Sequence, residues 1–228
     1  REIALQLIAG RLDVWVTIQE GLRQEEIYDI LKEEGLNIDF SDWLKATESK
    51  EGYLFPDTYL VPQEATAEAM VNIMLNNFTE KTKDLGKALA WEDIIVASLI
   101  EREVRTEKDR TIVGGILRKR LAEDWPLEID ATAQYAMANI KCKKEDKPEK
   151  CWWQAVTKED LKIDSPYNTY KNRGLPPAPI CNPSLSSIKA AVFPQKTDYW
   201  FYLSDSKGDL HFSETLEEQE SNIEKYLK

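Results

Sequence analysis

Hydrophobic and polar positions along this chain predict short strands near both ends and helices between them. Residues 13–18 alternate in polarity and are rich in β-branched side chains, which is typical of a strand. Two short runs, 199–203 and 210–213, flank a polar turn and indicate a hairpin. Apolar residues spaced three and four apart predict helices over 23–34, 42–47, 66–84, 91–104, 107–123, 131–139 and 215–227. This order favours an α+β fold, a mainly helical domain with small β-sheet elements.

The helix predicted over 107–123 has a defined start and an unusual middle. Thr106 is a favourable N-cap, because Asp109 follows it at the third position of the helix. Gly114 and Gly115 lower helix stability, so their presence predicts that another segment packs closely there.

Two segments carry turn signals instead of a helical period. Residues 51–59 are aromatic and contain a proline, which is typical of a loop with strand-like ends. Residues 166–183 contain five prolines and are predicted to be irregular but ordered.

Composition narrows the class of protein. With 42% hydrophobic residues, the 228-residue chain can bury a core, which indicates a folded protein. Its net charge of -11 and its pI near 4.8 disfavour nucleic acid as a partner. No apolar run approaches the roughly 18 residues that a bilayer-spanning helix needs. The chain begins at Arg1 without an initiator Met, so we expect any membrane anchor to lie upstream.

The three cysteines leave two interpretations open. Cys142 and Cys151 bracket a charged segment and either pair in an oxidising compartment or remain free thiols. Cys181 makes the count odd, so complete intramolecular pairing is excluded. One histidine and three scattered cysteines do not form a zinc-binding pattern, and we expect no metal and no organic cofactor.

Glu101 is the strongest candidate for a catalytic residue. On the helix predicted over 91–104 it shares a face with the small side chains of Ala97 and Ser98. A carboxyl at the end of an apolar stripe loses part of its hydration, which favours the protonated form and suits a general acid. The alternative is a boundary glutamate that pairs with Arg105, four residues on.

Polar and aromatic residues further along the chain are candidates for substrate contact. Asp130 precedes a predicted helix, where an N-cap is the stronger interpretation and a substrate contact the weaker. Tyr167 and Asn168 lie in a proline-bounded loop, where polar side chains usually face a solvent cleft, although Asn168 also suits an Asx-turn. Trp152 and Trp153 suit stacking on sugars, although most tryptophans pack in cores.

The residues that other common active sites require are missing from this sequence. His211 is the single histidine, it falls in a predicted strand, and no G-x-S-x-G sequence accompanies it. A Ser-His-Asp hydrolase is therefore disfavoured. The chain also has no P-loop and no dinucleotide fingerprint.

Residues 97–103, with the sequence ASLIERE, resemble a motif of one enzyme family. The motif is the A-S-[IL]-[IV]-E-[KR]-E block of the endolytic murein transglycosylases, the MltG or YceG-like family. Further segments resemble the family in the same order: Glu20-Gly21, Glu51 to Tyr59, Leu127 to Thr132, Ser165 to Tyr170, Gly174 to Ile180, Ser187 to Ala191 and Tyr199 to Ser213. The ordered set runs from about residue 1 to 228, so the chain is identified as a member of this family.

The resemblance implies a lytic transglycosylase that cuts peptidoglycan between N-acetylmuramic acid and N-acetylglucosamine without a cofactor. Glu101 matches the catalytic glutamate of the family. Glu103 lies about 200° further around the helix and is not expected to share that role. The matching blocks predict a set of substrate-binding residues: Asp130, Thr132, Tyr167, Asn168 and Thr169.

The resemblance also implies a location and partners. The family is bound to the bacterial inner membrane by an N-terminal helix, with its catalytic domain on the extracytoplasmic side. Residues 1–11 are interpreted as the tail of a LysM-like peptidoglycan-binding subdomain, and 12–228 as the catalytic region. The expected partners are peptidoglycan glycan strands and cell-wall synthases (penicillin-binding proteins). Residues 139–160 depart from the family pattern, which leaves open the substrate subsites near them.

Two other functions also fit the residues. A hydrolase would use Glu101 with Asp130 as its second carboxylate. A glycan-binding scaffold would tether cell-wall synthases without cutting. Activity on peptidoglycan separates the scaffold from both enzymes, and the mass of the new ends separates the two enzymes.

Overall fold

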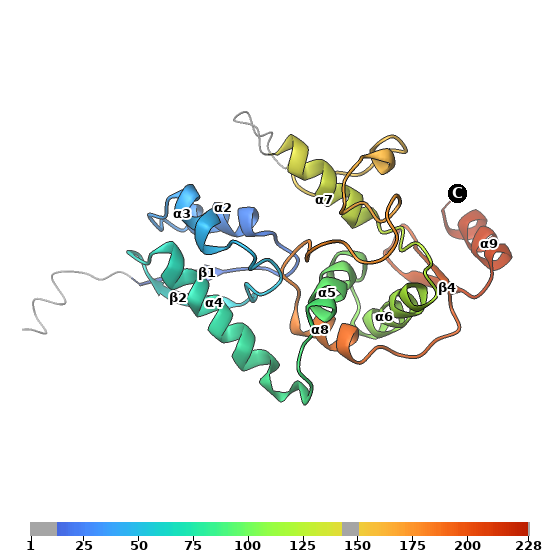
Figure 1. Cartoon of the computed structure of the whole chain (residues 1–228), viewed down its shortest axis with the longest axis horizontal. Coiled ribbons are helices and arrows are strands. Elements are labelled where there is room, and N and C mark those ends of the chain that lie inside the picture. Colours follow the sequence, from blue (N-terminus) through green and yellow to red (C-terminus); the bar gives the residue numbers. More distant parts are fainter. Residues whose placement is uncertain (1–12, 143–150, 228) are drawn as a thin grey trace, which may run out of the picture. The chain divides into compact units, whose positions relative to one another are not determined.

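A computed structural model describes residues 13–142 and 151–227 of the chain. The chain divides into two compact units, Arg1–Gly86 with Cys181–Ser184 and Lys87–Ile180 with Leu185–Lys228. Each unit combines helices with a two-stranded antiparallel sheet, which confirms the predicted α+β fold (Figure 1). Residues 1–11, interpreted as the tail of a LysM-like subdomain, lie outside the described residues.

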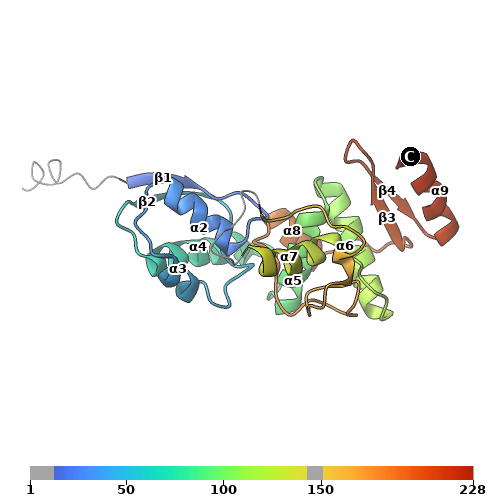
Figure 2. The same cartoon turned by 90° about the horizontal axis from the view of Figure 1, so that it is seen from above.

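The first unit is a small sheet that buries one of its faces. β1 (Asp13–Thr17) pairs antiparallel with β2 (Thr58–Pro62), so that Val16 lies opposite Tyr59. Side chains alternate along both strands, and the buried set joins one apolar core with three helices. Figure 2 shows the strands and these helices, which are α2 (Gln24–Glu33), α3 (Phe40–Ala46) and α4 (Ala67–Thr82), followed by the 3-10 turn Lys83–Leu85.

The second unit is built around α5 (Trp91–Glu103). All its residues from Asp93 to Ile100 are buried, which explains why its apolar pattern extends around the helix. It lies beside α6 (Glu107–Ala122) and α8 (Leu185–Val192) (Figure 1).

The remaining elements of the second unit follow the predicted order. α7 (Asp130–Lys141) contacts α5 and the 3-10 turn Asp160–Lys162. The predicted hairpin is present as β3 (Phe201–Ser204) and β4 (Leu210–Ser213), with Leu203 opposite His211. The terminal helix α9 (Leu216–Tyr226) packs on both strands of this hairpin.

Two glycines of α6 allow close approach of the segment that contains α8. A Cβ atom at Gly114 would lie 2.7 Å from the carbonyl oxygen of Ala190, and one at Gly115 would lie still closer to the carbonyl oxygen of Gln195. No other residue fits these positions without a backbone shift, which confirms the predicted close packing. The predicted cap is also present, since Thr106 Oγ1 accepts a hydrogen bond from the backbone N–H of Asp109 at 3.2 Å.

α8 was not predicted from the sequence. It has 8 residues, so its apolar pattern covers few turns. It also follows the proline-rich segment, whose turn signals obscure where the helix begins. Its residues Ser187, Ile188, Ala190 and Ala191 are all buried, so the helix lies in the core and not at its edge.

The structure decides between the two interpretations of the cysteines. Cys142 and Cys151 form a disulfide with their Cα atoms 5.7 Å apart, and Cys181 is a buried free cysteine. The disulfide packs against Ala138 and Trp152. It ties the end of α7 to the segment that carries the tryptophan pair.

Candidate active site

Glu101 lies near the C-terminal end of α5, where a cation from α6 pairs with its carboxylate. Arg110 Nη2 donates to Glu101 Oε1 at 2.9 Å, and the two side chains are 14% and 6% exposed. Arg110 Nε also donates to the carbonyl oxygen of Val104, the C-cap of α5, at 3.3 Å. The positive charge of the guanidinium therefore compensates both the negative charge of the carboxylate and the negative end of the helix dipole. Arg105 is exposed and lies against Gly208.

Other residues of the 97–103 motif hold α5 in place. Ser98 Oγ donates to the carbonyl oxygen of Ile95 at 2.7 Å and accepts from the backbone N–H of Ile180 at 3.1 Å. Ala97 and Ile100 are fully buried. The buried part of the motif thus fixes the position of the helix end that carries the glutamates.

Asp130 is not the helix cap that the sequence favoured. The N-cap of α7 is Ile129, and Asp130 is the first helical residue. Its side chain is exposed, and its Oδ1 accepts a hydrogen bond from the Tyr170 hydroxyl at 2.6 Å. The cap prediction fails because a backbone turn, closed by Thr132 N–H to Ile129 O at 3.0 Å, starts the helix one residue earlier.

Three of the predicted substrate-binding residues are buried. Thr132 Oγ1 lies 2.9 Å from Thr169 Oγ1, and Thr169 Oγ1 accepts from the backbone N–H of Ile129 at 3.0 Å. Asn168 Nδ2 donates to the carbonyl oxygens of Leu161 and Ile163, both at 2.9 Å. Asn168 Oδ1 accepts from the Tyr170 N–H two residues on at 3.1 Å, which is the Asx-turn alternative. These geometries support a role in holding the loop in position.

Tyr167 belongs to a partly buried aromatic cluster. Its ring lies 4.6 Å from that of Tyr135, which in turn lies 6.5 Å from Trp153. The guanidinium of Arg102 stacks on Trp153 at 3.8 Å from the ring centre. The cluster joins the loop, α7 and the end of α5, so Trp153, one of the two rings predicted for sugar stacking, lies near the helix end that carries the glutamates. Trp152, the other ring, packs against the disulfide.

A pocket of about 420 Å³ opens in the second unit. Its polar lining comes from α5, α6, α7, β3 and the loops between them: Glu103, Arg120, Glu128, Asp130, Tyr170 and Tyr202. Its apolar lining includes Leu127, Phe201, Leu203 and Leu210. This volume lies within the usual range for small-molecule sites.

Glu103 is the functional candidate that the sequence did not predict. The Tyr202 hydroxyl donates to Glu103 Oε2 at 3.1 Å, and the backbone N–H of Ala131 also donates to the carboxyl. Burial raises the pKa of Glu103 to about 7, and the charge of Asp130 adds to the rise. Glu103 and Glu101 face different partners, as the helical geometry predicts. No signal in the sequence links Glu103 to Tyr202, which lies 99 residues away.

A second buried carboxyl lies in the first unit, within the 51–59 segment. Glu51 Oε1 accepts from Asn182 Nδ2 at 2.6 Å, and its Oε2 accepts from the Gln24 N–H at 3.1 Å. Asn182 Oδ1 also accepts from the N–H groups of Gly52 and Leu54 at 2.8 and 2.9 Å. Burial raises the pKa of Glu51 to about 8. All the polar atoms in this network bind each other, which indicates a structural role.

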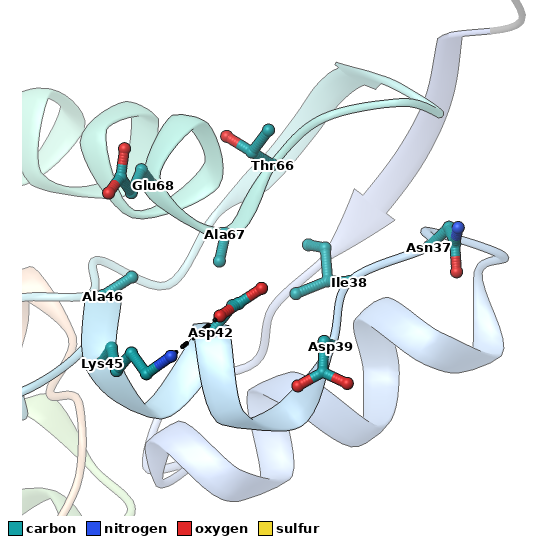
Figure 3. A pocket seen from close by; sticks show the side chains of 9 residues that line it. All are labelled: Asn37, Ile38, Asp39, Asp42, Lys45, Ala46, Thr66, Ala67 and Glu68. Atoms are coloured by element: carbon teal, nitrogen blue, oxygen red, sulfur yellow. Dashed lines mark hydrogen bonds and ion pairs between the residues drawn. The ribbon is translucent and has the colours of Figure 1, made fainter.

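The first unit has a pocket of its own, of about 480 Å³ (Figure 3). Figure 3 shows side chains from α3 and from the start of α4 around it, with Lys45 paired to Asp42 at 3.2 Å. Asp39 caps α3 by accepting from Ser41 N–H at 2.8 Å, and Thr66 caps α4. None of the predicted site residues lines this pocket, and four of its polar residues form helix caps or a surface ion pair: Asp39, Asp42, Lys45 and Thr66.

Several other features bear on the class of site. Within residues 13–142 and 151–227, no three His, Cys, Asp or Glu side chains are grouped to hold a metal ion. In the same ranges, no helix is long and apolar enough to cross a membrane. His211 Nε2 lies 3.0 Å from Asp205 Oδ2, and its ring stacks on Tyr226 at the hairpin.

Two glutamates, a pocket lined by one of them, and a partly buried aromatic cluster thus meet at the C-terminal end of α5. The chain belongs to the YceG-like family, which it matches over residues 1–225. It is 39% identical over 184 residues to an endolytic murein transglycosylase of Bacillus subtilis, covering 78% of this chain and 48% of that protein. It is 30% identical over 187 residues to an endolytic murein transglycosylase of Streptococcus pneumoniae, covering 78% of this chain and 32% of that protein.

A solved structure has the same fold. The crystal structure of a YceG-like protein from Listeria monocytogenes superimposes with a TM-score of 0.77 at 30% identity, covering 96% of this chain and 80% of that one. The chain thus spans about half the length of its Bacillus relative and about a third of its Streptococcus relative.

Proposed function

We propose that this chain is the cutting part of an endolytic lytic transglycosylase that acts on peptidoglycan glycan strands. The support is membership of the YceG-like family and the names of its relatives. The observation that carries the proposal is the placement of Glu101, which the motif assigns to catalysis. It sits at the end of a buried helix with its carboxylate 2.9 Å from a cation.

The proposed reaction needs one carboxyl that gives and then takes a proton. Protonated Glu101 donates to the glycosidic oxygen between N-acetylmuramic acid and N-acetylglucosamine, and the bond from that oxygen to C1 breaks. The C6 hydroxyl of the muramic residue then attacks C1, and its proton passes to the Glu101 carboxylate. The products are a 1,6-anhydro end and a free hydroxyl, and no water is consumed.

Arg110 fits this cycle as a positioning residue. Its guanidinium pairs with the carboxylate form of Glu101, which exists between the two proton transfers. The first proton transfer needs the protonated carboxyl, so the ion pair between Arg110 and Glu101 must open. Arg110 must therefore move away from Glu101 or bind another group when the glycan enters. The single-carboxylate reaction is favoured over the two-carboxylate hydrolase because Asp130 binds Tyr170 and lines a pocket with Glu103, whereas Glu101 binds Arg110.

We further propose an extracytoplasmic location at the bacterial inner membrane, with cell-wall synthases as partners. The Cys142–Cys151 disulfide supports an oxidising compartment. Residues 1–11 are proposed as the tail of a LysM-like subdomain and residues 12–228 as the catalytic region.

The mass of the cleaved ends tests the proposed reaction. Uncrosslinked glycan strands treated with the protein should yield 1,6-anhydro-N-acetylmuramic ends, each one water lighter than a hydrolysed end. Ends that carry the additional water would identify a hydrolase, and intact strands after prolonged incubation would favour the scaffold.

A further inference from the structure

The Glu103 carboxyl and the Asp130 carboxyl line the same pocket. Within the described residues the hydrogen-bond partners of Glu103 are the Tyr202 hydroxyl and the Ala131 N–H, and both are donors. A carboxyl at this position that keeps its own proton adds a third hydrogen, which needs an acceptor. Asp130, which lines the same pocket, can instead accept a further hydrogen bond. Its Oδ1 accepts from Tyr170, and its Oδ2 can accept from a further donor.

We propose that this pocket binds the N-acetyl group of a hexosamine, with Glu103 donating to the carbonyl oxygen and Asp130 accepting from the amide N–H. One amide supplies both missing partners, because its oxygen is an acceptor and its nitrogen is a donor. A plain hydroxyl also carries a donor and an acceptor, but it has no methyl group to place against the apolar part of the lining. The inference deepens the proposed function, since hexosamines with this group make up glycan strands.

The other walls of the pocket fit the remaining parts of such a ligand. Leu127, Leu203 and Leu210 offer an apolar lining for the acetyl methyl group. Phe201 lines the pocket, and its ring lies 6.2 Å from that of Trp125, which is 40% exposed. An exposed ring next to a polar pocket is suited to stacking on the face of a sugar.

Binding through Glu103 should depend on pH, because only the protonated carboxyl donates. The charged and titratable groups around it come from several elements: Arg102 on α5, Arg120 on α6, Glu128, Asp130 on α7, Tyr170 and Tyr202 on β3. Arg120 is buried and binds the carbonyl oxygens of Leu127 at 2.8 Å and Trp200 at 2.9 Å, so it stays with the backbone. The pKa of Glu103, about 7, then sets the pH above which binding weakens.

The test titrates chitotetraose into the whole chain and follows amide NMR signals near the pocket, at pH 5.5, 7 and 8.5 (chosen to span about 1.5 units on either side). Cellotetraose, which lacks acetamido groups, is the matched ligand control. We expect chitotetraose to shift the signals of Leu127, Leu203 and Tyr202, and to bind about tenfold more weakly at the highest pH. Glu103→Gln keeps a donor in place of the acid, so it should bind at every pH. Glu92→Gln, on the exposed start of α5, should behave as the parent.

Each outcome decides the proposal. It fails if chitotetraose leaves these signals unmoved, if cellotetraose binds equally well, or if Glu103→Gln retains the weakening at high pH. Glu103→Gln and Glu92→Gln are first checked for an unchanged amide spectrum, and Asp130→Ala gives a second route if Glu103→Gln is unfolded. Cutting of glycan strands is measured separately. Cutting without occupation of this pocket would reject the inference alone, and occupation without cutting would reject only the proposed reaction.

Discussion

Arg110 Nη2 lies 2.9 Å from Glu101 Oε1, so a cation from α6 holds the carboxylate at the end of α5. The same guanidinium binds the carbonyl oxygen of Val104 at 3.3 Å, which fixes it against the helix end. The two residues are nine positions apart and come from successive helices. The contact therefore links the predicted catalytic residue to the turn that separates α5 from α6.

Glu101→Gln should abolish cutting and leave the fold intact. Glutamine keeps the size of the side chain and an oxygen that accepts from Arg110, but it cannot donate and reclaim a proton. General acid-base groups are worth a factor of about 10² to 10⁴ in rate. The release of anhydro ends and the melting curve of the variant are the measurements. A variant that cuts at the parental rate with a parental melting curve would show that Glu101 is not the acid, and Glu92→Gln is the control.

Arg110→Gln should lower the rate of cutting by up to about 10²-fold, because the guanidinium that holds the Glu101 carboxylate at 2.9 Å is lost and the acid is misplaced. Arg110→Lys keeps a cation at this position and should lose less activity. The measurements are the release of anhydro ends and the melting curve of each variant, with Arg105→Gln at an exposed neighbouring position as the control. Equal rates in Arg110→Gln and Arg105→Gln would mean that this ion pair does not position the acid.

The stability of the chain should fall as pH rises from about 4.5 toward 8. Burial raises the pKa of Glu51 from 4.5 to about 8, and that of Glu103 to about 7. The folded state therefore binds protons more tightly than the unfolded state, so their stabilising contribution is complete below pH 4.5 and is lost across this window. The loss is on the order of a few kcal/mol.

Glu51→Gln tests the larger of these contributions. Urea unfolding at a series of pH values should show a flatter loss of stability in this variant, since glutamine does not titrate. Glu48→Gln, at an exposed position three residues earlier, should keep the parental slope. A parental slope in Glu51→Gln would place the pH dependence elsewhere. Glutamine at position 51 also replaces one of the two oxygens that accept from Asn182 and Gln24 by a donor, which lowers stability at every pH. The slope of stability against pH, and not its absolute value, is therefore the quantity to compare.

Gly115→Ala should destabilise the second unit strongly, by about 1 to 3 kcal/mol or more. Its Cβ would overlap the carbonyl oxygen of Gln195, which is backbone and moves only with its segment. Gly86→Ala is the control, because nothing lies within 4 Å of its Cβ position and only its φ of +68° is strained. Thermal unfolding of both variants gives the comparison, and equal losses would contradict close packing at residue 115.

The sequence by itself determined most of the helices and strands, but not α8, and it determined the family. Alternating polarity over 13–18 and helical spacing over 91–104 gave β1 and α5, because burial on one face or along a whole helix leaves a local period. The motif at 97–103 identified the family and marked Glu101. Gly114 and Gly115 predicted a close contact, since glycine inside a helix needs a packing reason.

Only the tertiary structure decided which partners the polar residues meet. Asp130 appeared to be a helix cap because caps are local, yet its carboxylate binds Tyr170, 40 residues away. Arg110 and Tyr202 reach the two glutamates of α5 from other elements, and Cys142 meets Cys151 because the chain returns to the end of α7. Hydrogen bonds and ion pairs depend on distances of about 3 Å between atoms, which no spacing along the sequence specifies.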